Sequence, residues 1–205
     1  MDDAVALHLT VLDMEFLSRF GPSFMRTYYR AWIAAPGSMS FTAVDDAGAL
    51  VGVLLGATDP ATHVRSMVRD HGLALVTAMI KAAALRPRLA KDLVVTRGGR
   101  YVRGVTRLLA RRIRRSTPTT LPDQPKVGEV THVLVDPSRQ GGGIGRLLIE
   151  VAVTTARDHG NDELVLVTPP DLAARHFYDA LGWTADGSMT SRSGEPFLRY
   201  RFVLH

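Results

Sequence analysis

Apolar positions in the first 57 residues follow a helical spacing and then a strand-like one. Apolar residues recur every three or four positions from Val5 to Phe16 and again after Gly21-Pro22, which predicts two helices. The second of these is expected to stop at Pro36-Gly37. Two β-rich runs follow, at 39–44 and 50–56, and the turn formers between them favour a hairpin.

The pattern from residue 62 to residue 115 is helical. Short apolar stripes are expected to break at His71-Gly72 and at Pro87, and after residue 99 arginines line one face of a basic amphipathic helix. Residues 116–125 carry turn chemistry throughout and predict a loop.

The last third of the chain alternates between strands and helices. A strand over Glu129–Val135 leads into a helix over Gly143–His159, and a second strand over Leu164–Thr168 leads into a helix over Asp171–Leu181. Two more β-rich runs, 183–189 and 197–204, finish the chain. Strand, helix and strand in succession predict parallel pairing across the first crossover and an α/β fold.

Composition limits the class of protein. The chain has 205 residues, 46% hydrophobic and 22% charged residues and no cysteine, which fits one domain with an ample core and excludes a disulfide scaffold. The first residues resemble no signal peptide, and no apolar run is long enough to span a membrane. We therefore expect a soluble, cytoplasmic protein.

Positive charge is concentrated in the middle of the chain. Residues 60–128 hold 15 Lys/Arg against 3 Asp/Glu, although the whole chain carries a formal net charge of only +5. Such a segment either meets anions or forms a solvated arginine-rich helical face.

A glycine-rich turn joins the first C-terminal strand to its helix, in the stretch VTHVLVDPSRQGGGIGRLLIEVA. Glycines let the backbone approach a ligand closely, and the free N–H groups of a first helical turn favour phosphate. The turn is neither a Walker loop nor a dinucleotide fingerprint, because no GK[ST] follows and Arg146 stands where the last glycine should be. It is expected to hold a diphosphate.

Two ordered motifs carry a family resemblance. Residues 140–145, QGGGIG, resemble the Q/R-x-x-G-x-G/A signature of the GNAT superfamily of N-acetyltransferases, and the preceding V-D-P matches as well. The run DLAARHFYDALGW, from Asp171 to Trp183, resembles the later signature of the same superfamily. The resemblance implies one domain over 1–205 with a mixed α/β sheet, a helical insertion over 62–115 and an acetyl-CoA-binding core over 129–183.

The resemblance also implies acetyl-CoA as the acyl donor, with direct attack by a primary amine. The positions that match the family's cofactor site are Val133, Leu134, Val135, Gln140, Gly141, Gly142, Gly143, Ile144, Gly145, Arg146 and Asp171. The thioester would lie where the two central parallel strands separate.

Two residues match catalytic positions. Tyr178 matches the family's acid, although it could instead pack the helix on the sheet. Glu129 lies at the spacing of the family's catalytic glutamate and is the candidate base, although it could be a solvated strand end. Strict alternation places His132 on the opposite side of the strand, as a second candidate base or as a core histidine with satisfied hydrogen bonds.

Two departures from the family are visible. The family's usual first strand is missing, and Asp171 stands where an asparagine is usual. The seven histidines show no ligand spacing with carboxylates, so no metal site is predicted.

The acceptor and the partners stay open. If arginines 100, 103 and 107 build the acceptor site, they favour a small anionic amine. Longer acyl chains, O-acceptors, a homodimer and peripheral membrane contact remain alternatives. A further alternative is a non-catalytic CoA-binding protein whose basic helix docks on anionic lipid or nucleic acid, although no recognised nucleic-acid motif is present.

Overall fold

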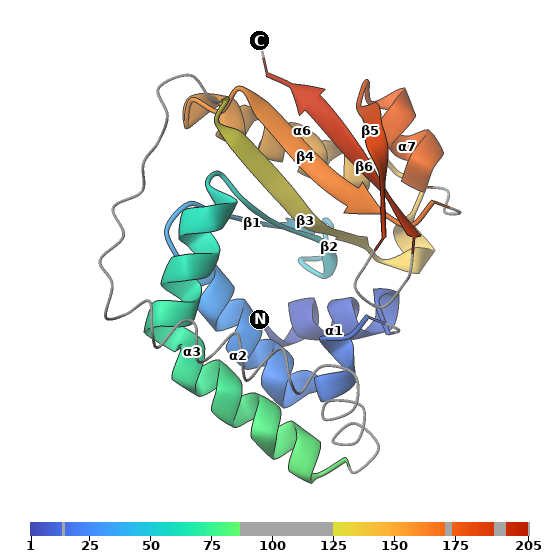
Figure 1. Cartoon of the computed structure of the whole chain (residues 1–205). Helices are drawn as coiled ribbons and strands as arrows, with labels where there is room; N and C mark the ends of the chain where they lie inside the picture. The colour runs from blue at the N-terminus through green and yellow to red at the C-terminus, as the bar shows by residue number, and fades with distance from the viewer. Residues whose placement is uncertain (14, 87–124, 171–173, 191–195, 205) are drawn as a thin grey trace.

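A six-stranded mixed sheet forms the centre of the computed structural model, which describes residues 1–13, 15–86, 125–170, 174–190 and 196–204. The strands lie in the order β1-β2-β3-β4-β6-β5 (Figure 1). Their bounds are β1 Ser38–Val44, β2 Leu50–Ala57, β3 Val127–Val135, β4 Glu163–Thr168, β5 Thr184–Thr190 and β6 Pro196–Val203. Strands β3 and β4 are parallel and the other neighbours antiparallel, which confirms the predicted mixed α/β sheet.

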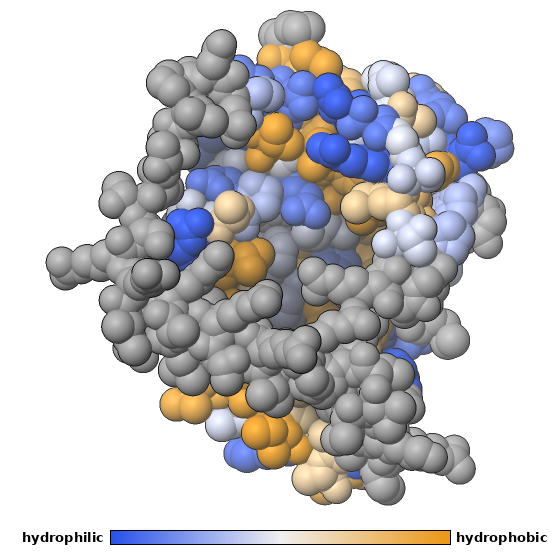
Figure 2. Space-filling model, viewed as in Figure 1, coloured by the Kyte–Doolittle hydropathy of each residue, from blue (hydrophilic) through white to orange (hydrophobic). Residues whose placement is uncertain are grey.

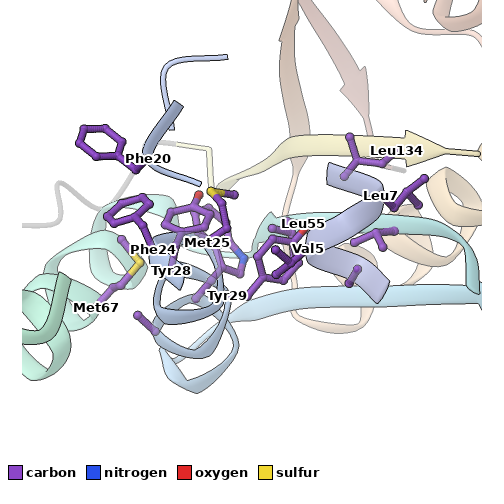
Figure 3. Close-up of a cluster of buried hydrophobic side chains, with 14 of the residues drawn as sticks. Val5, Leu7, Phe20, Phe24, Met25, Tyr28, Tyr29, Leu55, Met67 and Leu134 are labelled. Atoms are coloured by element: carbon purple, nitrogen blue, oxygen red, sulfur yellow. The ribbon is translucent and has the colours of Figure 1, made fainter. Parts of the chain in front are cut away.

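Three N-terminal helices cover one face of the sheet, at β1, β2 and β3 (Figure 1). They are α1 Asp2–Val11, α2 Pro22–Ala34 and α3 Pro60–Ala84, with a 3-10 turn, η1 Ser18–Phe20, between the first two. Helix α2 begins as expected, with Gly21 at a φ of +80° followed by Pro22. Its aromatic side chains form a buried cluster with Val5 and Leu55, drawn in Figure 3.

The opposite face of the sheet is covered by α6 Ile144–Asp158 and α7 Ala174–Ala180. Strand β2 is buried on both faces: Val53 and Leu55 pack with the N-terminal helices, and Leu54 packs with α6. The sheet therefore separates two hydrophobic clusters. Within the described residues the first strand follows two helices.

Two sequence-based boundaries were wrong. Helix α3 runs unbroken through His71-Gly72 for 25 residues. A glycine inside a helix lowers the stability of that helix by only about 1 kcal/mol. The packing of α3 against α2 offsets this loss. Helix α1 ends at Val11, before Phe16, because the chain turns after Leu12 and brings Glu15 back beneath His8.

The rest of the expected helical insertion lies outside the described residues. Helix α3 accounts for its first part, whereas residues 87–115, including arginines 100, 103 and 107, and nearly all of the loop expected at 116–125 are not described. The single-domain division stays a prediction. No helix in the described ranges is long and apolar enough to cross a membrane.

Gly56 in β2 and Gly72 in α3 differ in the space that surrounds them. A Cβ at Gly56 would lie 2.6 Å from the Glu129 carbonyl oxygen, whereas a Cβ at Gly72 would meet only Val68, at 3.5 Å. We expect Gly56→Ala to lower the free energy of unfolding by about 1–3 kcal/mol through overpacking. Gly72→Ala should raise it by about 0.5–1 kcal/mol. Urea denaturation of both variants measures the difference, and equal effects would contradict this account of β2 and β3.

Candidate active site

The two central parallel strands pair over only three residues each. Glu129 pairs with Val165, and this is the last of the three pairs. Beyond it, β3 continues along β2 as far as Val135, and β4 continues along β6 as far as Thr168. The facing backbone edges of β3 and β4 therefore separate and leave N–H and C=O groups without a ladder.

Val133, Leu134 and Val135, which the family resemblance assigns to the pantetheine arm, lie on this separated edge of β3. The side chain of Leu134 is buried against the N-terminal helices, and that of Val133 packs on the α6 side. Their side chains therefore anchor the strand to both clusters. Their backbone groups are left for whatever occupies the gap.

The glycine-rich turn follows directly after β3. Asp136 begins the 3-10 turn η3 Pro137–Arg139, and its carboxylate accepts hydrogen bonds from the backbone N–H and the hydroxyl of Ser138. Gly141 and Gly143 both have a φ of +81°, and a Cβ on either would meet nothing within 4 Å. These two glycines serve the backbone conformation of an open turn.

Gly143 is also the N-cap of α6 and has no side-chain cap. The first N–H groups of a helix lack intrahelical partners, so the N–H groups at the start of α6 are available to an anion. The helix dipole adds a partial positive charge there. Gln140 and Arg146 are exposed beside the turn, and Ile144 is half-buried beneath it.

Gly145 has a different role from the other glycines of the turn. A Cβ at this position would lie 3.2 Å from the Phe177 ring and 3.7 Å from Val135. The missing side chain lets the beginning of α6 approach the end of β3 and the helix that carries Tyr178. The turn, the strand edge and α7 are thereby brought together. Asp171 of the expected cofactor set lies outside the described residues.

Tyr178 lies in an aromatic cluster on the α6 side of the sheet. Its ring centroid is 5.1 Å from that of Phe177, 5.9 Å from that of Trp183 and 5.7 Å from that of Tyr200. Burial raises the pKa of its hydroxyl to about 12, so the group carries its proton at neutral pH. The packing role considered from the sequence is present, and it is compatible with proton donation.

Glu129 is half-buried at the point where the two strands separate. Burial raises the pKa of its carboxyl above the ordinary value, and the electrostatic interactions with His132 and Arg199 oppose this rise. A carboxylate with a raised pKa is a better proton acceptor near neutral pH.

A β-bulge in β3 corrects the predicted orientation of His132. Leu55 pairs with His132 and Gly56 with Val130, so Thr131 is an extra residue, and its hydroxyl donates to the Leu55 carbonyl at 2.8 Å. Val130 then packs with α6, whereas His132 meets α1. Glu129, next to Val130, therefore shares the α1 face with His132, contrary to strict alternation.

The structure joins His132 to two residues that sequence spacing did not reveal. The Glu15 carboxylate is 2.8 Å from His8 Nε2 through Oε2 and 3.2 Å from His132 Nε2 through Oε1. The two imidazole rings lie 4.9 Å apart, and His8 Nδ1 is 3.1 Å from the Tyr29 hydroxyl. His132 and Glu15 are 117 positions apart, which is why no sequence motif signals the pair.

Glu15 is a carboxylate held in its ionised form. Burial alone would raise its pKa, but the hydrogen bonds with His132 and His8 outweigh this and lower the pKa to about 2. The same negative charge, together with burial, raises the pKa of the Tyr28 and Tyr29 hydroxyls. The half-buried Glu15 therefore places a negative charge beside the two protonated phenols of Tyr28 and Tyr29.

The face of β6 and β5 on this side of the sheet carries charged residues. Arg201 lies 2.8 Å from Asp186 and 3.3 Å from Glu163, and a hollow of about 280 Å³ is lined by Thr184, Asp186, Arg201 and Val203. Figure 2 shows the surface recessed at the centre of the view, with hydrophilic side chains above the recess. The hollow lined by Thr184, Asp186, Arg201 and Val203 is a separate feature, at strands β5 and β6 on the edge of the sheet.

The comparisons with known proteins agree with this geometry. The model of the acetyltransferase (GNAT) family matches residues 9–183, and the chain belongs to that family. A solved putative GNAT acetyltransferase from Desulfovibrio desulfuricans has a TM-score of 0.54 at 15% identity, with 100% of this chain and 95% of that chain covered. An aminoglycoside 6'-N-acetyltransferase complexed with coenzyme A has a TM-score of 0.57 at 12% identity, with 100% and 90% covered.

Among curated proteins, the mycothiol acetyltransferase of Rhodococcus opacus is 42% identical over 62 residues, or 30% of this chain. That of Rhodococcus erythropolis is 40% identical over 62 residues, again 30% of this chain. The chain spans only about a fifth of the length of these relatives. The family model and the fold together place the chain among the GNAT acetyltransferases.

The ionised Glu15 predicts how stability depends on acid. A carboxyl whose pKa falls from 4.5 to about 2 on folding stabilises the protein fully above pH 4.5, and this stabilisation is lost between pH 4.5 and 2. Urea denaturation across pH 6 to 2 should show a smaller loss of stability for Glu15→Gln than for the wild type. The exposed Glu150→Gln is the matched control and should keep the wild-type slope. Parallel curves for all three proteins would contradict the assignment.

Proposed function

We propose that the protein transfers the acetyl group of acetyl-CoA to the primary amine of a small acceptor, without a covalent acyl-enzyme. The observation that carries the proposal is the gap between β3 and β4, which opens beside the uncapped beginning of α6. An unpaired strand edge suits an amide-containing arm, and a free helix N-terminus suits a diphosphate. Both lie next to each other here because Gly145 allows close packing.

Acetyl-CoA would supply the thioester carbonyl that the amine attacks. Residues 141–146 would bind its diphosphate through backbone N–H groups, with Arg146 adding a positive charge. The edge of Val133–Val135 would pair with the pantetheine arm and place the thioester near Glu129. Gln140, Ile144 and Asp171 keep the cofactor-binding assignments that the family motifs gave them. The cysteine-free chain fits a reducing compartment such as the cytoplasm.

Glu129 and Tyr178 each carry out one of the two proton transfers that the reaction needs. As the new N–C bond forms, the Glu129 carboxylate accepts the proton that the amine loses, by way of a water. As the C–S bond breaks, the Tyr178 hydroxyl donates to the leaving thiolate. Holding the amine against the thioester gives the larger increase in rate. Proton transfer by Glu129 and Tyr178 adds a smaller increase.

The acceptor is proposed only as a primary amine. The arginines on which an anionic acceptor depends lie outside the described residues, and so does the basic helix of the non-catalytic alternative. In the described part, Glu15 and Glu129 face the α1 side, which favours a cationic ammonium group near the reaction centre. An acidic group of the acceptor would then bind farther away.

A glutamate in the glycine-rich turn should abolish cofactor binding. In Gly143→Glu a negative charge faces the expected diphosphate, so calorimetric titration with acetyl-CoA should show binding to the wild type and at least a 10-fold weaker affinity in the variant. Gly160→Glu is the matched control, because Gly160 also has a positive φ, +71°, and lies at the other end of α6. Equal binding by both variants, or no binding by the folded wild type, would contradict the proposal.

Removal of one hydroxyl should test the acid. Tyr178→Phe keeps the aromatic packing and is expected to lower kcat about 10²-fold, with the affinity for acetyl-CoA unchanged. The rate is measured as thiol release in the presence of amine acceptors such as spermidine, glucosamine and a short peptide. Wild-type kcat in the variant would leave Tyr178 with a packing role alone.

A further inference from the structure

The hydrogen bonds around Glu15 define the tautomers of both histidines. Because Glu15 is ionised, each of its oxygens accepts a hydrogen bond, and the donors are the Nε2–H groups of His8 and His132. A neutral His8 then has an unprotonated Nδ1, which accepts a hydrogen bond from the Tyr29 hydroxyl. Every polar atom of His8 is thereby satisfied inside the core.

One ring nitrogen of His132, Nδ1, is buried and makes no hydrogen bond to the described residues. Its side chain is nine-tenths buried, at 9% exposure. A buried acceptor without a partner is destabilising, so its presence in a site calls for a reason. The carboxylate on one side and the free lone pair on the other are the arrangement of a histidine used as a proton acceptor.

The bulge at Thr131 places the His132 imidazole on the same face of β3 as Glu129. Glu129 and His132 share the α1 face, on either side of the extra residue. Glu129 is the last residue that pairs with β4. The unpartnered imidazole is therefore the next titratable group along β3 from the point where the thioester is expected.

We propose that His132 relays the proton lost by the acceptor amine, a step that rests on the proposed acetyl transfer. Glu129 takes the proton that the acceptor nitrogen loses as the N–C bond forms, and the carboxyl then passes it to His132 Nδ1. The resulting imidazolium keeps its Nε2–H hydrogen bond to Glu15, whose charge stabilises it. Release of the proton to solvent returns His132 to its starting form.

Binding of a metal ion is an alternative role for the same side chains. The ligand-type atoms of His8, Glu15 and His132 lie within 4.8 Å of one another. However, the hydrogen bonds already occupy both Nε2 atoms and both carboxylate oxygens. His132 Nδ1 also lacks the outer partner that usually orients a ligating histidine. The hydrogen bonds of Glu15 with both histidines therefore favour the relay over a metal ion.

Nitrogen NMR tests the tautomer without any acceptor. In ¹⁵N-histidine-labelled wild type at neutral pH, His132, assigned by comparison with His132→Gln, should show a protonated Nε2 and an unprotonated Nδ1. In Glu15→Gln this preference should be lost. A protonated Nδ1 in the wild type, or stoichiometric zinc in the purified protein, would overturn the relay.

The pH profile of kcat/KM tests the relay itself. At pH 7, His132→Gln should lower kcat/KM about 10²-fold with the affinity for acetyl-CoA unchanged, and the rate should recover at high pH, where the amine is free. Glu15→Gln should move the acid limb to lower pH, because the carboxylate that stabilises the imidazolium is gone. Among the described residues, the charged or titratable groups that face this site are His8, Glu15, Tyr28, Tyr29, Glu129 and Arg199.

His159→Gln is the control, because His159 is exposed at the end of α6, and it should keep the wild-type profile. Turnover of the wild type with an unchanged profile in His132→Gln would overturn the relay and leave the acetyl transfer standing. No thiol release by the wild type with spermidine, glucosamine or a short peptide would overturn both.

Discussion

The early end of pairing between β3 and β4 is the constraint on which the rest of the site depends. Two buried parallel strands that separate after Glu129 leave backbone groups that must find partners. The sheet can accept this because β2 and β6 hold the outer edges of the two strands along their full separated length. The neighbouring strands β2 and β6 therefore hold the two sides of the gap in place.

The bulge at Thr131 places two titratable side chains on the same face of β3, next to the gap. In a regular strand Glu129 and His132 would point to opposite faces, one toward α6 and one toward α1. The extra residue turns both toward α1, and the Thr131 hydroxyl holds the distorted strand by its bond to Leu55. Gly56 belongs to the same device, since a side chain there would strike the Glu129 carbonyl.

Local patterns predicted most of the fold. The hairpin, the strand–turn–helix unit at 127–158 and the family all followed from spacing, glycines and two motifs. The bulge could not be predicted, because Thr131 is an ordinary strand residue and the extra position appears only in the register with β2. The partnership of Glu15 with His132 was equally hidden, since it joins distant parts of the chain through tertiary packing.

The residues of the candidate site lie on both faces of the sheet. The glycine-rich turn, α6 and Tyr178 lie with one hydrophobic cluster, whereas His8, Glu15 and the aromatic residues of α2 lie with the other. The two clusters share little besides β2 and β3. Under the proposed acetyl transfer, the N-terminal helices could therefore change with the acceptor, while the α6 side keeps its sequence and its geometry.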